Sequence, residues 1–344
     1  MTRFKYSVGP WNVNEGGDSY GPAVRQPIPF EEKIKKFAEM GFSAIQFHDD
    51  DAVPNINDLS EEEIKAEARK VKALLDKYGL VAEFVAPRLW MDPHTKDGGF
   101  MSVSEEDRNF AMWRAYRSID IANELGADKV VLWLAREGTL CAESKSPVWA
   151  TQKLIEAING MLSYDANIKI MIEPKPNEPI DRSICGTLGH VMGVSAATID
   201  PSRVGALLES AHAILAGLDP AHEIGFGMAM GKLWGVHLND QNGIKYDQDK
   251  TFGVENLRAA FNQVKVLVEN GFGDNGEYVG LDVKAMRTTS QEDAYKHLEN
   301  SLKIVQALED KVAKFDYDFQ KKCVENMDFE GLEMYVMNLL MGIE

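Results

Sequence analysis

Cysteine is scarce in this sequence. Among 344 residues there are three cysteines, Cys141, Cys185 and Cys323, and they lie far apart in the chain. An odd number of widely separated cysteines suits neither a disulfide framework nor the paired spacing of a zinc knuckle. We therefore expect reduced thiols.

Long hydrophobic runs and an excess of positive charge are also missing. No stretch approaches the roughly 18 consecutive apolar residues of a membrane span, and the first residues, MTRFKY, contain no apolar core of a signal peptide. The formal net charge of −17 repels phosphate backbones and anionic lipids. We expect a cytoplasmic protein that binds neither nucleic acid nor membrane and that attracts cations.

No low-complexity linker or block of like charge marks a domain boundary. Short apolar runs instead alternate with amphipathic stretches, which is typical of repeated βα units. Ser60 with Glu63, and Ser104 with Asp107, have the spacing of helix N-caps. The expected strands are residues 4–8, 44–48, 81–86, 129–134, 168–173, 203–209, 233–238 and 278–283. The expected helices are residues 30–39, 60–78, 104–125, 147–162, 254–269 and 291–308, with weaker, glycine-rich ones at 187–198 and 219–230.

Eight strands that are each followed by a helix predict an α/β fold of the (β/α)8 TIM barrel type, with a doubly wound sheet as the alternative. We expect residues 1–309 to form the catalytic barrel and residues 310–344 a short C-terminal helical extension. Active residues of such barrels lie at the C-terminal ends of the strands. Polar or aromatic residues fall at or near these ends: His48, Trp133, Glu173, Glu209, His237 and Asp282.

The stretch IKIMIEPKPNEP, from Ile168 to Pro179, brings a carboxylate and an ammonium to one strand end. Glu173 ends the apolar run, and two prolines flank Lys175. Because proline removes a backbone donor and fixes φ, the segment presents these side chains in a stiff, extended form. The alternative is an ordinary surface pair between Glu173 and Lys175.

Further residues are candidate ligands for hard cations. Glu209 and His212 form an E-x-x-H spacing, and His237 ends the seventh strand. Asp247 and Asp249 project to the same side if their segment is extended, and Asp282 completes the set. With Glu173, these oxygens and two imidazoles suit Mg²⁺, Mn²⁺ or Co²⁺. The alternative interpretation of each single carboxylate is a solvated surface charge. For His237 the alternative is a buried histidine that is hydrogen-bonded to a neighbour.

His48 is followed by three aspartates. A neutral imidazole oriented by a carboxylate is a proton-transfer pair, and Asp51 is the better orienter if the loop turns back. A helix N-cap cluster is the alternative. Near other strand ends, Trp11, Trp90 and Trp133 are candidates for the walls of an apolar pocket that removes water from a small polar substrate, such as a sugar whose CH face stacks on aromatic rings; tryptophans are, however, more often core residues.

Five motifs, in this order over about residues 11–300, resemble those of the D-xylose isomerase family. They are Phe47-His-Asp-Asp-Asp51, Lys96-Asp-Gly-Gly-Phe100, Trp133-x-x-Arg-Glu-Gly138, Glu173-Pro-Lys-Pro-Asn-Glu-Pro179 and Gly243-Ile-Lys-Tyr-Asp-Gln-Asp249. The resemblance implies a TIM barrel with two divalent cations per subunit that interconverts an aldose and a ketose by a metal-assisted hydride shift. It also implies a homo-oligomer.

Roles follow from the resemblance residue by residue. Glu173, Glu209 and Asp282 match ligands of a structural metal, and Glu209, His212, Asp247 and Asp249 match ligands of a catalytic metal. His48, held by Asp51, matches the ring-opening base, and Lys175 matches the residue that polarises the carbonyl oxygen. Trp11, Trp90 and Trp133 match aromatic walls, and Tyr20 matches an aromatic that reaches into a neighbouring subunit's site.

The departures from the family concern the metal and the substrate. His237 stands in place of an aspartate ligand; we expect it to coordinate and to favour Mn²⁺ or Co²⁺ over Mg²⁺. Ala86 replaces a threonine that bonds the sugar, Arg88 adds a charge nearby, and Trp90 stands where Phe is commoner. The part after Asp310 is shorter than the family's arm, which leaves a homodimer as plausible as a homotetramer.

Three hypotheses result. The first is an isomerase that converts D-xylose to D-xylulose, with D-glucose to D-fructose as a side activity. The second keeps the barrel and the metals but isomerises or epimerises another sugar or sugar derivative by proton transfer, with a carboxylate or His237 as the base. The third is an inactive sugar-binding or assembly subunit, against which Lys175 and His48 speak.

Overall fold

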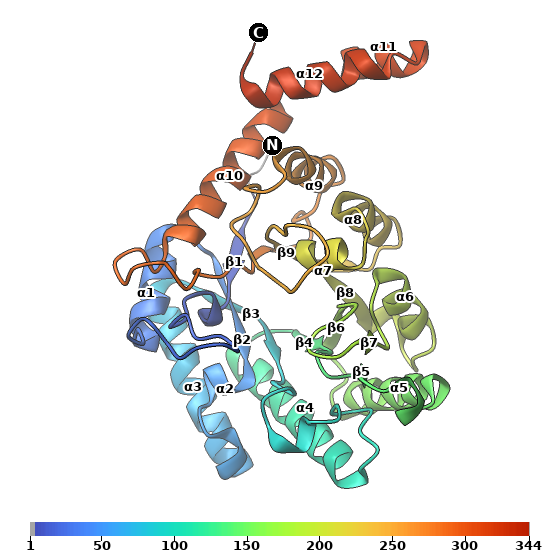
Figure 1. The fold of residues 1–344 in the computed structure, drawn as a ribbon. Helices are drawn as coiled ribbons and strands as arrows, with labels where there is room; N and C mark the ends of the chain where they lie inside the picture. Colours follow the sequence, from blue (N-terminus) through green and yellow to red (C-terminus); the bar gives the residue numbers. More distant parts are fainter. Residues whose placement is uncertain (1–3, 344) are drawn as a thin grey trace.

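The computed structural model describes residues 4–343, and in them the eight expected strands form one closed barrel (Figure 1). Neighbouring strands are parallel, and β1 closes the barrel by pairing with both β2 and β10. The TIM barrel prediction is therefore confirmed, and the doubly wound alternative is wrong. The strands are β1 (Tyr6–Val8), β2 (Ala44–His48), β3 (Val81–Ala86), β4 (Lys129–Trp133), β6 (Lys169–Glu173), β8 (Val204–Glu209), β9 (Leu233–Leu238) and β10 (Val279–Leu281).

Helices surround the barrel as the outer layer (Figure 1). Ser60 accepts a hydrogen bond from the Glu63 amide, and Ser104 accepts one from the Asp107 amide, so both predicted caps are present. The main helices that follow the eight strands are α1 (Phe30–Met40), α3 (Glu61–Tyr78), α4 (Glu105–Leu125), α5 (Pro147–Tyr164), α6 (Leu188–Ala196), α8 (Pro220–Ala229), α9 (Leu257–Glu269) and α10 (Lys296–Ala313).

Two helices begin later than the sequence predicts. α9 begins at Leu257 because the Asn256 side chain accepts a hydrogen bond from the Ala259 amide and caps the helix there. α10 begins at Lys296, since Gln291 is used elsewhere: its side-chain oxygen accepts a hydrogen bond of 2.8 Å from the Gln26 amide. In both cases a side-chain oxygen accepts a hydrogen bond from a backbone amide and so sets where the helix begins.

The barrel has two apolar layers, because alternate residues of a strand face opposite sides. The larger layer lies between the strands and the helices. The smaller one fills the barrel interior with Phe84, Ala86, Val131, Met171 and Leu207, against which Trp11 and Trp234 pack.

Several short elements at the strand ends were not predicted, because they are too short to show a periodicity. They include α2 (Asp49–Ala52), α7 (Ser210–Leu215), the antiparallel pair β5 (Gly138–Thr139) and β7 (Arg182–Ser183), and the 3-10 turns η1 (Pro10–Asn12), η2 (Ile56–Asp58), η3 (Pro93–Thr95), η4 (Ala142–Ser144) and η5 (Pro201–Arg203).

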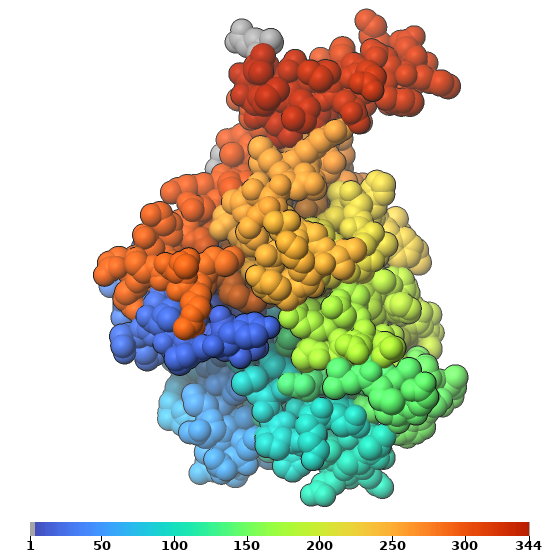
Figure 2. All heavy atoms as spheres, viewed as in Figure 1, coloured from blue at the N-terminus to red at the C-terminus, as the bar shows by residue number. Residues whose placement is uncertain are grey.

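Two further helices, α11 (Tyr317–Asn326) and α12 (Phe329–Met341), follow α10. They stand away from the barrel, as Figures 1 and 2 show. No helix in residues 4–343 is long and apolar enough to cross a membrane.

Candidate active site

A cavity of about 440 Å³ opens at the C-terminal ends of the strands. Thirteen of the fifteen residues that the sequence singles out line it. The two others are Asp51, which lies behind His48, and Tyr20, which is 99% exposed on a loop. The lining residues are Trp11, His48, Arg88, Trp90, Trp133, Glu173, Lys175, Glu209, His212, His237, Asp247, Asp249 and Asp282.

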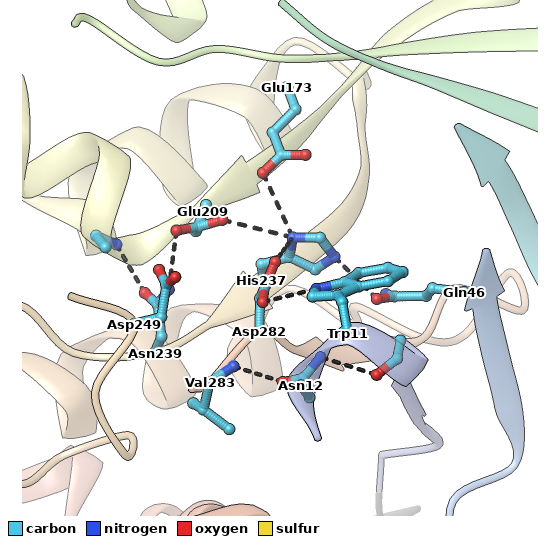
Figure 3. Close-up of polar contacts among 12 residues, drawn as sticks. Trp11, Asn12, Gln46, Glu173, Glu209, His237, Asn239, Asp249, Asp282 and Val283 are labelled. Atoms are coloured by element: carbon cyan, nitrogen blue, oxygen red, sulfur yellow. Dashed lines mark hydrogen bonds and ion pairs between the residues drawn. The ribbon is translucent and has the colours of Figure 1, made fainter. Parts of the chain in front are cut away.

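Four of these residues form the strand-end cluster: Glu173, Glu209, His237 and Asp282. Glu173 and Glu209 end β6 and β8, His237 is the penultimate residue of β9, and Asp282 directly follows β10. His237 Nδ1 lies 3.5 Å from Glu173 Oε1, 3.6 Å from Glu209 Oε2 and 3.6 Å from Asp282 Oδ2 (Figure 3). These distances are long for hydrogen bonds. Two donors about 2.1 Å from one tetrahedral ion lie about 3.4 Å apart, so this spacing suits donors that share a cation.

A buried network below the cluster fixes the orientation of His237. The Gln46 amide group donates hydrogen bonds to Ser7 Oγ (3.1 Å) and to Glu83 Oε2 (3.0 Å). Gln46 Oε1 therefore faces His237 Nε2, at 3.1 Å, and accepts its hydrogen. His237 Nδ1 then points at three carboxylates and is buried without a hydrogen-bond partner among the described residues. In the neutral imidazole this nitrogen carries the lone pair that a cation would bind.

Gly280 leaves room for this network. A Cβ at Gly280 would lie 2.5 Å from Gln46 Nε2 and 2.9 Å from His237 Cδ2. Sequence reasoning missed Gln46 and Glu83, although a signal was present: both are polar residues inside strands that otherwise read as apolar. Lys284, two residues after Asp282, was also missed.

Glu209, His212 and Asp247 form a second group, the loop cluster. His212 Nε2 lies 3.3 Å from Glu209 Oε1 and 3.2 Å from Asp247 Oδ2. Asp247 Oδ2 also accepts a hydrogen bond of 2.9 Å from Lys175 Nζ. Asp247 Oδ1 and His212 Nδ1 are buried with no hydrogen-bond partner in residues 4–343. Both clusters have oxygen and nitrogen donors that fit a cation, and they share Glu209.

Asp249 does not join the loop cluster. The expected extended form of residues 247–249 is wrong, because Asp249 has a φ of 46°, in the left-handed region. Its Oδ1 accepts a hydrogen bond of 3.2 Å from Asn239, and its Oδ2 pairs with Lys284 Nζ at 2.5 Å. Asp247 and Asp249 therefore have different partners.

The crowding of acids shows in their pKa values. Burial and the neighbouring carboxylates hold the pKa of Glu209 and that of Asp249 above their ordinary values. Burial alone would lower the pKa of His237, but Glu173, Glu209 and Asp282 outweigh it and hold that pKa well above its usual range. A cation would relieve this repulsion, as expected for a site that binds one.

Lys175 is buried, with 6% of the residue exposed. Burial favours the neutral amine, but Asp247 and Glu178, at 2.9 and 3.3 Å, outweigh it and raise the pKa of Lys175. Its Nζ lies 5.1 Å from the centre of the Trp133 ring. Lys175 is thus a charged donor at the cavity wall.

The predicted contact between His48 and Asp51 is present, with 3.0 Å between Nδ1 and Oδ2. Arg88 Nη2 reaches the same ring nitrogen at 2.8 Å, which the sequence did not indicate. The imidazole lies between Trp11 and Trp90, with ring centres 4.3 and 5.1 Å away.

Comparison with known proteins adds a family and a set of structures with the same fold. Residues 34–297 match the family described as xylose isomerase-like TIM barrel. A D-tagatose 3-epimerase-like protein is 18% identical, with a TM-score of 0.65 over 90% of this chain and 99% of the other. The apo form of 3-keto-D-glucoside 4-epimerase from E. coli is 16% identical, with a TM-score of 0.62 over 89% and 100%. D-psicose 3-epimerase with D-tagatose, from Clostridium cellulolyticum H10, is 12% identical, with a TM-score of 0.61 over 90% and 99%.

Proposed function

Because the chain belongs to the xylose isomerase-like TIM barrel family, we propose that it is a divalent-cation-dependent sugar epimerase or isomerase that moves a proton at a carbon next to a carbonyl group. This is the second hypothesis from the sequence. The observation that carries it is the strand-end cluster, in which carboxylates approach one imidazole nitrogen from several sides. Structural neighbours that are sugar epimerases, namely 3-keto-D-glucoside 4-epimerase and D-psicose 3-epimerase, support it.

The residues of the strand-end cluster fit a cation. Glu173, Glu209 and Asp282 offer carboxylate oxygens, and His237 offers a bare nitrogen. Three oxygens and one imidazole suit Mn²⁺ or Co²⁺ better than Mg²⁺, which prefers oxygen alone. When bound, such a cation stabilises negative charge on a sugar oxygen next to the reacting carbon.

Two carboxylates support this proposed proton transfer. Glu173 and Asp282 flank His237 Nδ1 from opposite directions (Figure 3). Burial raises the pKa of Asp282, helped by Glu209. At Glu173 the burial effect is outweighed by His237 and His212, so the pKa of Glu173 is lowered. The two carboxylates therefore have different electrostatic surroundings.

The reaction then follows from this placement. One carboxylate takes the proton of the C–H bond, the electron pair of that bond forms a C=C bond, and the π electrons of the carbonyl move to its oxygen, which gives an enediolate. Return of a proton to the opposite face of the same carbon gives an epimer, and return to the adjacent carbon gives an isomer. Trp11, Trp90 and Trp133 limit the access of water to this intermediate.

A second candidate is the aldose-ketose isomerase with a hydride shift, which converts D-xylose to D-xylulose. The loop cluster and the buried, charged Lys175 favour it, because a hydride shift needs both sugar oxygens held and their charge stabilised.

Isotope exchange separates these candidates. Metal-stripped protein is refilled with Mg²⁺, Mn²⁺ or Co²⁺ and incubated in D₂O with a panel of aldoses and ketoses. We expect turnover with deuterium incorporated next to the carbonyl carbon, most strongly with Mn²⁺ or Co²⁺. Turnover without deuterium identifies the hydride shift. Sugar binding without turnover under any metal identifies the inactive subunit.

A further inference from the structure

Two groups compete for one nitrogen of His48. Nδ1 lies 3.0 Å from Asp51 Oδ2, which accepts hydrogen bonds, and 2.8 Å from Arg88 Nη2, which donates them. A neutral imidazole nitrogen either carries a hydrogen or accepts one. Nδ1 therefore either donates a hydrogen bond to Asp51 or accepts one from Arg88.

The surroundings favour the hydrogen bond from Arg88 to Nδ1 over the one from Nδ1 to Asp51. Asp51 has other donors, since its Oδ2 accepts from the His48 amide at 3.1 Å and its Oδ1 from Arg88 Nη2 at 3.1 Å. A guanidinium stays protonated and offers only donors. A hydrogen on Nδ1 would place two N–H groups against each other over 2.8 Å, whereas a bare Nδ1 accepts the hydrogen bond. The hydrogen of His48 therefore belongs on Nε2.

Arg88 is held firmly in this position. Its Nε donates to Asp50 Oδ1 at 2.7 Å, and its backbone amide donates to Asp49 Oδ1 at 3.1 Å. Asp49 is itself buried and paired with Arg114 through two bonds of 2.6 and 2.7 Å. The guanidinium carbon lies 5.6 Å from the centre of the Trp90 ring. This bracing keeps the donor pointed at His48.

The other nitrogen of His48 is available to a ligand. His48 lines the cavity, and no described residue between positions 4 and 343 forms a hydrogen bond with its Nε2. A neutral Nε2–H group donates a hydrogen bond but has no lone pair with which to take a proton. Opening a sugar ring requires a base that takes the proton of the anomeric hydroxyl group. The electron pair of that O–H bond then forms the C=O bond, the ring C–O bond breaks, and the ring oxygen is protonated.

We propose that Arg88 is a positioning residue that fixes His48 as the neutral Nε2–H tautomer, so that His48 orients the substrate by a hydrogen bond and does not open a ring. The substrate is then a sugar whose carbonyl group is free and not masked by ring closure. This inference rests on the proposed function and replaces the ring-opening role that the family resemblance implied for His48.

The tautomer is measured directly by NMR on protein with ¹⁵N-labelled histidine. The chain has seven histidines, and the His48 signals are those lost in His48→Gln. We expect the Nε2–H pattern in the wild type and the Nδ1–H pattern in Arg88→Met, where Asp51 is the remaining partner. The control is Arg136→Met, which removes another guanidinium of the cavity wall, one that donates to the Trp90 carbonyl, and should leave the His48 pattern unchanged.

A wild-type spectrum with the Nδ1–H pattern or with an imidazolium overturns the proposal without any variant. An Nε2–H pattern that persists in Arg88→Met overturns the role of Arg88.

The substrate class is tested with two sugars. Erythrulose is too short to close a ring, whereas D-xylose is almost wholly cyclic. With Mn²⁺ present, we expect kcat/KM for deuterium exchange at the carbon next to the carbonyl to be about a hundredfold higher for erythrulose than for D-xylose. In Arg88→Met, the ratio of these two kcat/KM values should be smaller. Equal or reversed values overturn the assignment. Turnover of neither sugar overturns the proposed function as well, while the spectrum still decides the tautomer.

Discussion

The strand-end cluster and the loop cluster share Glu209 but are built differently. Around His237, the donors sit at or next to the ends of four neighbouring parallel strands, and a second layer of Gln46 and Glu83 sets the imidazole. Around His212, one donor comes from the long loop after β9, and Lys175 already neutralises it. The first site is thus shaped before a cation arrives, and the second is closed by an internal ion pair.

This difference predicts an order of binding. A cation enters the strand-end cluster by replacing the proton that the carboxylates favour on His237, without displacing another side chain, and relieves the repulsion among these carboxylates. In the loop cluster it has to displace Lys175 from Asp247. We therefore expect the strand-end cluster to fill first, and the loop cluster to fill only when substrate or excess cation draws Lys175 away.

Glu209→Gln gives the largest expected effect, because it weakens both clusters. The loss of a ligand oxygen should exceed the roughly 10–100-fold loss of metal affinity that follows removal of an outer partner. Calorimetric titration with Mn²⁺ measures it, with Glu62→Gln on the exposed face of α3 as the control. Unchanged affinity in Glu209→Gln would contradict the shared site.

Gln46→Leu tests the strand-end cluster alone. Without the acceptor on its Nε2, His237 can turn or change tautomer, and Mn²⁺ affinity should fall by about 10–100-fold at this site only. The matched control is Gln263→Leu, which removes another buried glutamine, one that bonds Ser210 and not His237. Equal losses in both variants would mean that the effect is general destabilisation.

Lys175→Met tests the loop cluster. Freed from the lysine, Asp247 should bind a second Mn²⁺ about 10–150-fold more tightly, since a hydrogen bond to a charged group contributes about 1.5–3 kcal/mol. Lys284→Met is the control, because Lys284 pairs with Asp249 and not with Asp247. If the second Mn²⁺ binds no more tightly in Lys175→Met, the ion pair does not close the site.

The smallest expected effect concerns the pH dependence of stability near Trp11 and Asp282. His297 on α10 donates to the Asn12 carbonyl at 2.9 Å, and burial lowers the pKa of His297 from 6.5 to about 4. Between these values the unfolded chain binds a proton that the folded chain does not, so stability falls as the pH drops. The loss at pH 6 is about 0.8 kcal/mol. Urea unfolding at pH 7.5 and pH 6 should show this loss in the wild type and not in His297→Gln; parallel behaviour of the two would contradict it.

The fold was predictable from the sequence to within a few residues, and the reason is physical. Buried parallel strands and amphipathic helices have clear patterns, and caps such as Ser60 with Glu63 define helix ends locally. The helix starts that moved, at Leu257 and Lys296, are those where a side chain binds a distant or neighbouring backbone group.

The grouping of the candidate ligands in one cavity was predictable from the sequence, but the residues that orient them were not. The order of strand ends placed His237 beside Glu173 and Asp282, and the structure brings them together. The sequence does not show which way a ring nitrogen points, so the contacts of Gln46 with His237 and of Arg88 with His48 could not be derived. These contacts join residues far apart in the chain.

The most direct test of the order of binding is pulsed EPR of the protein with one equivalent of Mn²⁺. We predict a signal from one directly bound imidazole nitrogen that His237→Gln abolishes and His212→Gln leaves intact. A nitrogen signal that survives in His237→Gln and disappears in His212→Gln would show that the loop cluster fills first and would contradict the account.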